Sequence, residues 1–256
     1  MGYAPLVSRA EISAPDGEPE PGAGRRISRR TAALVAAPAC ATVLLVAGVR
    51  LTAELTRAPT PAERAEAAAA ELSGRYRTWT AGRIFPAGLA YRLGQASAET
   101  ARRVGIGPDT RCETAVDDAF AGTLTARGCR AVLRATYLDQ AQGLAVTVGV
   151  VVLPDERSAR EAVAFFPSRK PGPGLRALPL PGSVAARFGD AARQASTAAQ
   201  RGPYVVAATA GYADGRPAMR GSPADAAELT PQLVQGVLRP LTAPAEVRCG
   251  AREWRC

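Results

Sequence analysis

Cysteines are the residues of this sequence with the clearest chemistry. The chain has five, and four of them follow a long uncharged apolar segment: Cys112, Cys129, Cys249 and Cys256. An even number of cysteines beyond an export-type segment favours disulfide bonds. Three pairings are open, and proximity in the sequence favours Cys112 with Cys129 and Cys249 with Cys256. Metal binding is the rival interpretation, but the chain has no Cys-x-x-Cys motif and no histidine.

Histidine is absent from the whole chain of 256 residues. The sequence therefore lacks the commonest general base and every Ser-His or Cys-His pair. Ser168 stands close to Lys170, but such spacing arises often by chance, and no G-x-S-x-G motif occurs. Asp117 and Asp118 are adjacent carboxylates that would point apart in a helix or a strand. The sequence predicts no catalytic residue, no cofactor and no metal site.

A basic loop is the other candidate site. Residues 168–176 read SRKPGPGLR and place Arg169, Lys170 and Arg176 in a Pro/Gly-rich segment. Such a loop is expected to be exposed, with its charges available to lipid head groups, wall polymers or an acidic protein. The alternative is an ordinary solvated loop in an Arg-rich chain of net charge +9. No run of five basic residues occurs and no aromatic interrupts a basic stripe, so we do not expect nucleic-acid binding.

The segment at residues 31–49 has no charged side chain. As a helix it would be about 28 Å long, close to the hydrocarbon thickness of a bilayer. Four arginines precede it, at positions 25, 26, 29 and 30, and basic residues stay on the cytoplasmic side. We therefore predict a disordered cytoplasmic tail at residues 1–30, a transmembrane helix in the lipid bilayer at residues 31–50, and an extracytoplasmic remainder. A cleaved export signal and a lipidated Cys40 are the alternatives.

The extracytoplasmic part divides into a linker with a stalk helix, residues 51–75, and a domain, residues 76–256. Thr60, Pro61 and Glu63 have the spacing of a capping box with proline at the first helical position. An Ala-rich helix is therefore expected to begin there. Its apolar face is weak, so the sequence leaves open whether this helix is a stalk or part of the domain.

Segments in which apolar and polar residues alternate, and segments rich in valine, predict the strands of the domain's sheet. Residues 130–137 and 144–153 are predicted to form an antiparallel hairpin, and residues 204–212 another strand. Further expected elements are weak strands at 84–92 and 184–188, and helices at 98–104, 115–120, from 155, and after the Ser-Pro and Thr-Pro pairs at 222 and 230. The fold class predicted is α+β, an antiparallel sheet with helices packed on one face and one transmembrane helix before it.

Several segments resemble those of uncharacterised single-pass membrane proteins of actinobacteria. They read RIFPAGLAY, ARRVGIGP, GCRAVLRATYLD, VTVGVVVLPD and GPYVVAATAGYADGRP. The resemblance covers roughly residues 76–256 and implies a disulfide-bonded domain outside the cytoplasm. Its motifs are structural, and no activity comes with it, so it assigns no functional residues.

Three classes of function remain. The first is a non-enzymatic binding or accessory module of the cell envelope, anchored in the membrane, whose partner is an envelope protein or an anionic wall polymer. The second is a membrane-tethered hydrolase that uses a serine with Lys170 or a carboxylate. The third is the sensor subunit of a signalling system. The missing histidine and the missing catalytic motifs favour the first class, which is our prediction.

Overall fold

The computed structural model describes residues 29–166, 171–217 and 224–244, and for residues 29–37 and 39 it describes the backbone alone. The chain divides into two units, Met1–Ala58 and Pro59–Cys256. The predicted cytoplasmic tail lies almost wholly outside the described residues. So does the predicted pair Cys249 and Cys256.

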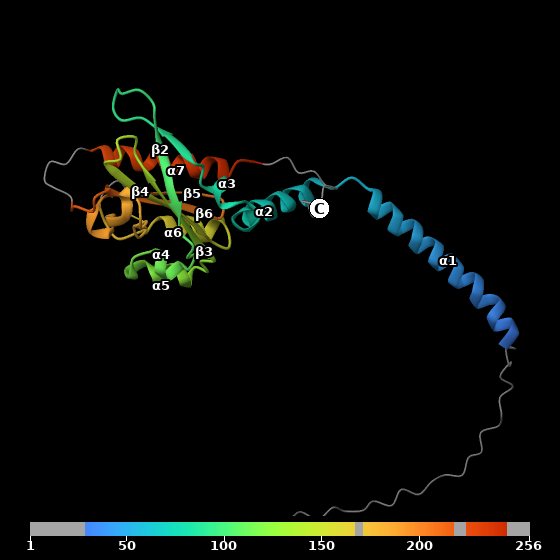
Figure 1. Cartoon of the computed structure of the whole chain (residues 1–256). Coiled ribbons are helices and arrows are strands. Elements are labelled where there is room, and N and C mark those ends of the chain that lie inside the picture. The colour runs from blue at the N-terminus through green and yellow to red at the C-terminus, as the bar shows by residue number, and fades with distance from the viewer. Residues whose placement is uncertain (1–28, 167–170, 218–223, 245–256) are drawn as a thin grey trace, which may run out of the picture. The chain divides into compact units, whose positions relative to one another are not determined.

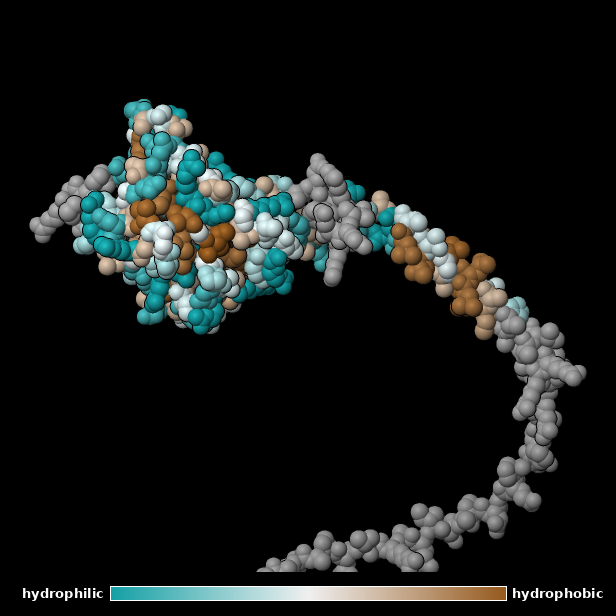
Figure 2. Space-filling view, in the orientation of Figure 1, coloured by the Kyte–Doolittle hydropathy of each residue, from teal (hydrophilic) through white to brown (hydrophobic). Residues whose placement is uncertain are grey.

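Helix α1, Arg29–Thr56, covers the predicted transmembrane segment (Figure 1). Its successive apolar side chains Val43, Leu44, Leu45 and Val46 are all more than half exposed, and Figure 2 shows such side chains gathered along the helix. In the part of the chain whose side chains are described, no helix has an apolar stretch long enough to cross a membrane. The first half of the predicted span lies outside that part.

Helix α2, Pro61–Thr78, begins at the predicted capping box. The Thr60 hydroxyl accepts from the Glu63 backbone N–H, and the Glu63 carboxylate accepts from the Thr60 N–H at 2.7 Å. The compact unit that contains this helix begins at Pro59. The end of α2 packs against the core of this unit through Leu72 and Tyr76.

Six strands form one antiparallel sheet in the order β1-β2-β3-β4-β6-β5. Their bounds are β1 Gly88–Tyr91, β2 Glu99–Ile106, β3 Ala131–Leu138, β4 Leu144–Val152, β5 Arg193–Arg201 and β6 Tyr204–Tyr212. The α+β class, the antiparallel sheet and the β3–β4 hairpin are confirmed. β1 and β5 are the two edge strands, and the sheet curls so that helix α7, Asp225–Leu241, contacts both of them.

Helices cover both faces of the sheet, so the prediction of helices on one face is wrong. In β4, Val146, Val148 and Val150 belong to the cluster that contains α7. The opposite side chain Val151 packs with α6, Glu156–Val163, and with the short helices α4, Cys112–Ala115, and α5, Asp118–Ala126. Every residue of β4 is buried. A strand buried on both faces reads as a near-continuous apolar run, so the Val-rich sequence of β4 was a signal that both faces of the sheet are covered.

Two predicted elements have a different structure. The residues expected to form a helix at 98–104 belong to strand β2. Pairing with β1 and β3 overrides the helix propensity of the Ala, Glu and Arg residues in this segment. The strand expected at residues 184–188 is the 3-10 helix η1, Val184–Arg187, which is followed by another, η2, Asp190–Ala192. Strand β5 was not expected, since its sequence RQASTAAQR has no large apolar residue.

Candidate functional site

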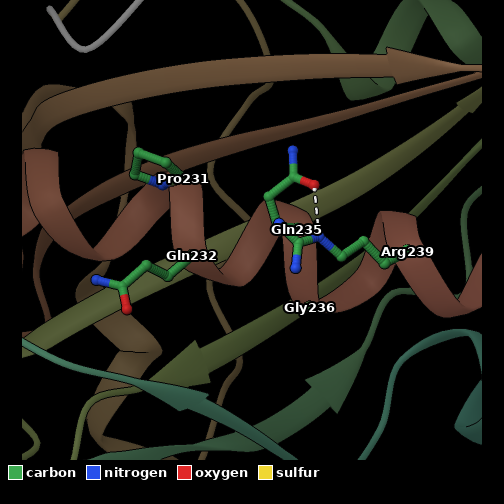
Figure 3. Close-up of a pocket in the computed structure, with 5 residues that line it drawn as sticks. All are labelled: Pro231, Gln232, Gln235, Gly236 and Arg239. Carbon is green, nitrogen blue, oxygen red and sulfur yellow. Dashed lines mark hydrogen bonds between the residues drawn. The ribbon is translucent and has the colours of Figure 1, made fainter.

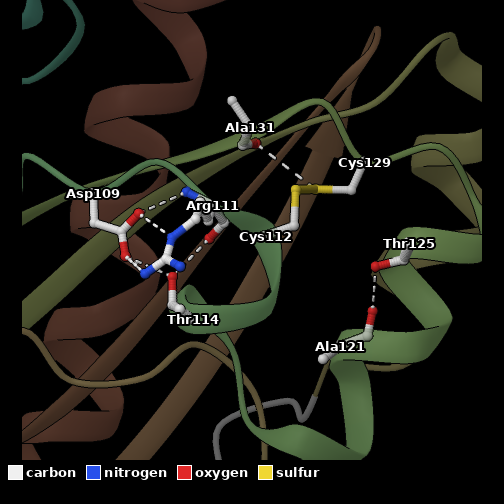
Figure 4. The surroundings of a disulfide bond; sticks show 8 residues. All are labelled: Asp109, Arg111, Cys112, Thr114, Ala121, Thr125, Cys129 and Ala131. Carbon is white, nitrogen blue, oxygen red and sulfur yellow. Dashed lines mark hydrogen bonds and ion pairs between the residues drawn. A yellow bond between two sulfur atoms is a disulfide. The ribbon is translucent and has the colours of Figure 1, made fainter.

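The predicted disulfide between Cys112 and Cys129 is confirmed (Figure 4). It joins helix α4 to the residues just before β3, with 6.4 Å between the two Cα atoms. Beside it, Asp109 accepts from the Arg111 guanidinium and, at 2.7 Å, from the Thr114 hydroxyl. These hydrogen bonds hold the pKa of the Asp109 carboxyl well below its usual range. Within the described residues the disulfide fixes α4 and α5 on the sheet and presents no reactive thiol.

Arg176 is the one member of the predicted anion-binding loop that lies within the described residues. Its Nη2 atom is 2.8 Å from the Asp118 carboxylate, and its side chain is 34% exposed. The guanidinium is therefore paired with an exposed carboxylate, and its binding of a further anion stays a prediction. The preceding Leu175 is buried against the sheet, which draws the end of the loop inward. Arg169 and Lys170 lie outside the described residues, so their anion binding remains a prediction.

Residues 171–180, here called the strap, lie across the face of the sheet opposite α7. Sheet hydroxyls bind its backbone: Thr136 Oγ1 donates to the Leu178 carbonyl at 2.7 Å, and Thr147 Oγ1 accepts from the Leu178 N–H at 2.8 Å. Thr209 Oγ1 donates to the Leu175 carbonyl at 2.6 Å. Because a buried backbone group must be paired, these hydroxyls take the place of a neighbouring strand. Their role is structural.

A charged network lies at the edge of the strap. Arg193 is almost buried, and its guanidinium is 2.8 Å from Asp117 and 2.8 Å from Asp190. Arg134, buried nearby, has a lowered pKa because burial penalises its charge. Its Nη1 atom donates to the Arg176 carbonyl at 3.4 Å. The described contacts of this network join parts of the domain to each other, which indicates a structural role.

The outer edge of β1 has a different character. The backbone N–H and C=O groups of its odd-numbered residues point toward β2. This is shown by the bond from the Arg103 N–H to the Ala87 carbonyl and by the register of Leu89 opposite Ala101. In an antiparallel ladder the even-numbered residues then direct their N–H and C=O groups outward. Gly88 and Ala90 are exposed, and no hydrogen bond to their outward groups is present among the described residues.

Helix α7 closes one end of this edge. The Arg92 N–H donates to Gln232 Oε1 at 2.9 Å, and Gln232 Nε2 donates back to the Arg92 carbonyl at 2.7 Å. Farther on, the Gly94 N–H donates to the Glu228 carboxylate at 2.9 Å. The amide of Gln232 thus occupies the place of a peptide group from an adjacent strand. No described residue covers the edge from Ala90 back to Gly88 with hydrogen bonds.

A hollow of about 410 Å³ lies on α7 beside this open edge (Figure 3). Its lining consists of Pro231, Gln232, Gln235, Gly236 and Arg239. Figure 3 shows these residues along one side of the helix, with the Gln235 and Arg239 side chains close together. The hollow adjoins β1 because a Cβ atom on Gly236 would be 3.0 Å from the Leu89 side chain.

We call the open edge of β1 and this hollow together the edge groove. It offers two outward N–H groups, two outward carbonyls, a largely apolar surface, two amides and the guanidinium of Arg239. Arg239 is exposed and forms no ion pair with another described residue. Such a groove is suited to holding an extended chain. The groups that form it include no nucleophile, general base or set of metal ligands.

Sequence reasoning did not identify the edge groove. It treated residues 84–92 as a poor strand because of Pro86 and treated the α7 stripe as core. One signal was present, since a proline beside a short strand restricts that strand to the edge of a sheet. The position of α7 along that edge depends on tertiary packing, which a local sequence pattern does not predict.

Comparison with protein-family models, with curated proteins and with solved structures found no match to this chain. The arguments about function below therefore rest on the geometry of the chain itself.

Proposed function

We propose that this protein is a membrane-anchored binding module of the cell envelope, non-enzymatic, whose folded domain acts outside the cytoplasm. The observation that carries the proposal is the edge groove. It combines an apolar hollow with strand-edge groups of Gly88 and Ala90 that no described residue pairs, and with the guanidinium of Arg239, which bonds Gln235 and forms no ion pair with a described residue. These are features that hold a partner, and they lie on one rigid helix and one strand of the sheet.

The membrane anchor is proposed from the sequence of residues 31–50. The apolar side chains of α1 that are described are exposed on all sides of the helix, and a helix that is apolar all round requires apolar surroundings. The arginines before the segment favour a cytoplasmic N-terminus. The Cys112–Cys129 disulfide supports an oxidising compartment for the domain. The kinship with actinobacterial membrane proteins belongs to the same proposal.

Retention on envelope material tests the binding function. The full chain, purified in detergent, would be applied to isolated cell envelopes from its host, and the bound fraction measured. We expect Arg239→Glu to reduce retention. The control Arg201→Glu makes the same charge reversal on β5, the opposite edge strand, and should leave retention unchanged. Equal retention of both variants and the unaltered chain would show that the edge groove does not bind the envelope.

Topology is tested separately with a reporter enzyme fused after Cys256. The proposal expects reporter activity only outside the cytoplasm, because the N-terminal arginines hold the preceding segment inside. Activity inside the cytoplasm would overturn the localisation. A mature form that begins after the apolar segment and appears in the medium would show a cleaved signal in place of an anchor.

A further inference from the structure

We propose that the edge groove takes the carboxyl end of an extended polypeptide, which adds to β1 as an antiparallel strand and places its terminal carboxylate on Arg239. This inference rests on the proposed binding function and gives the chemical class of the partner. It is argued below from the direction of the groove, from the side-chain pattern that it accepts, and from its charge.

The direction follows from the alignment of α7 with β1. Glu228 contacts Gly94 and Gln232 contacts Arg92, while Gly236 lies beside Leu89. The helix therefore runs opposite to the strand, and Arg239, nearly one turn beyond Gly236, lies towards the Gly88 end. A strand antiparallel to β1 runs the same way as α7. The carboxyl end of the added strand therefore lies at the end of the groove that contains Arg239.

The length and pattern follow from the ladder. The outward groups of Ala90 and Gly88 allow four backbone hydrogen bonds to two alternate residues of an added strand. The residue between those two lies opposite Leu89. Because opposite residues of an antiparallel pair point to the same face, its side chain enters the apolar hollow beside Gly236. The groove thus selects an apolar side chain at the position opposite Leu89, and the Gln232–Arg92 pair stops the added strand at the other end.

The charge favours a carboxylate over an uncharged end. Among the described residues that line the hollow, Arg239 is the only charged one. Glu228, whose carboxylate lies at the other end of this edge, already accepts from the Gly94 N–H. An added carboxylate would therefore meet a guanidinium that no described acid neutralises.

Fluorescence anisotropy with a labelled Thr-Val-Thr-Val peptide tests this proposal on the full chain in detergent. The peptide with a free carboxyl end is expected to bind about threefold to fivefold more tightly than the same peptide with an amidated end, the size of effect of an exposed ion pair. Arg239→Gln should abolish that difference. The matched control Arg201→Gln should preserve it.

A second arm tests the backbone pairing. Ala90→Pro removes an outward N–H, and we expect binding about tenfold weaker, the upper range for one hydrogen bond. N-methylation of both threonines of the probe leaves the protein unaltered and removes the bonds that the peptide N–H groups would donate to the Ala90 and Gly88 carbonyls. It should weaken binding at least as much. This arm keeps the proposal testable if Ala90→Pro fails to fold.

Three results would overturn the inference: no binding of the free-carboxyl peptide, equal binding of the N-methylated peptide, or equal binding of the amidated peptide. Self-association of the chain that Ala90→Pro removes would assign the edge to a second copy and would also overturn it. None of these results bears on retention by the envelope, so the proposed function fails only if Arg239→Glu leaves that retention unchanged.

Discussion

The side-chain amide of Gln232 pairs with both backbone polar groups of Arg92, accepting from its N–H at 2.9 Å and donating to its carbonyl at 2.7 Å. Helix α7 thereby completes the edge of β1 with a side chain in the position of a strand. Two groups that would otherwise be exposed to competing partners are satisfied within the fold. The relationship defines where the edge groove ends.

Replacement of this amide should loosen β1. Gln232→Ala removes two hydrogen bonds, and we expect the free energy of unfolding to fall by about 1 kcal/mol, because the groups that are freed reach water. Chemical denaturation of the full chain in detergent measures the change. Gln235→Ala is the matched control on the same helix face, and it should leave the free energy of unfolding almost unaltered. An equal loss in both variants would contradict a specific role for Gln232.

Arg75 should be among the most sensitive positions in the chain. It is 2% exposed, its Nε donates to Glu71 at 2.8 Å, and its Nη1 donates to the Leu241 and Ala243 carbonyls at 2.7 Å each. It therefore joins α2 to the end of α7. Arg75→Ala leaves these acceptors unpaired, and we expect a loss of about 3 kcal/mol in the free energy of unfolding.

The matched control for Arg75 is Arg64→Ala, an exposed position about three turns earlier in α2. It should change the free energy of unfolding by no more than about 0.5 kcal/mol. Hydrogen exchange gives an independent measurement, since Arg75→Ala should accelerate exchange in both α2 and the end of α7. If only α2 were affected, the two helices would not be coupled through this side chain.

Local signals predicted the central fold well. The capping box at Thr60, the hairpin at residues 130–153 and the strand at residues 204–212 each depend on a short pattern that the structure preserves. The disulfide between Cys112 and Cys129 was also accessible, because proximity in sequence favoured that pairing. Such features form from neighbouring residues, so little information from the rest of the chain is needed.

The missed features depend on partners distant in sequence. β2 has the composition of a helix but pairs with β3, and β5 has small residues because α6 and α7 pack against it. The strap was expected to be solvated, yet Leu175 inserts over Gly149, where a Cβ atom would be 2.5 Å from it. The edge groove requires both β1 and α7, so neither segment alone could predict it.

Removal of the Cys112–Cys129 disulfide should destabilise the domain without changing its fold. The bond closes a loop of sequence separation 17, which corresponds to about 3 kcal/mol in the chain-entropy model. We expect Cys112→Ser with Cys129→Ser to lower the free energy of unfolding by about that amount. Cys40→Ser, outside the domain, should have no effect. Non-reducing peptide mapping should show the 112–129 link together with the predicted link between Cys249 and Cys256.

Alkaline pH should destabilise the domain through its buried tyrosines. Burial raises the pKa of Tyr204 to about 12, and its hydroxyl donates to the Leu72 carbonyl at 2.6 Å. Burial also raises the pKa of Tyr91 to about 12. A phenol that ionises near pH 10 when unfolded binds its proton more tightly when folded, so its contribution is complete below pH 10 and is lost between about pH 10 and 12.

The free energy of unfolding should therefore decrease as pH rises above 10, as measured by denaturant titration at successive pH values. Tyr204→Phe cannot ionise, and it should show a shallower decrease. A decrease of equal slope in the variant and the unaltered chain would assign the alkaline transition to other groups.

The basic loop permits a test that separates Arg169 and Lys170 from Arg176. The Arg176 guanidinium is 2.8 Å from Asp118, so its neutralisation should alter retention on an anionic wall polymer little. Arg169→Gln with Lys170→Gln should weaken retention if those charges bind the polymer, and the effect should shrink as salt rises, because exposed charges are screened within about 10 Å at 0.1 M. Sedimentation with purified polymer measures the bound fraction at each salt concentration, and circular dichroism checks the fold of each variant. If neither added salt nor the double substitution changed the bound fraction, the loop would not bind anions.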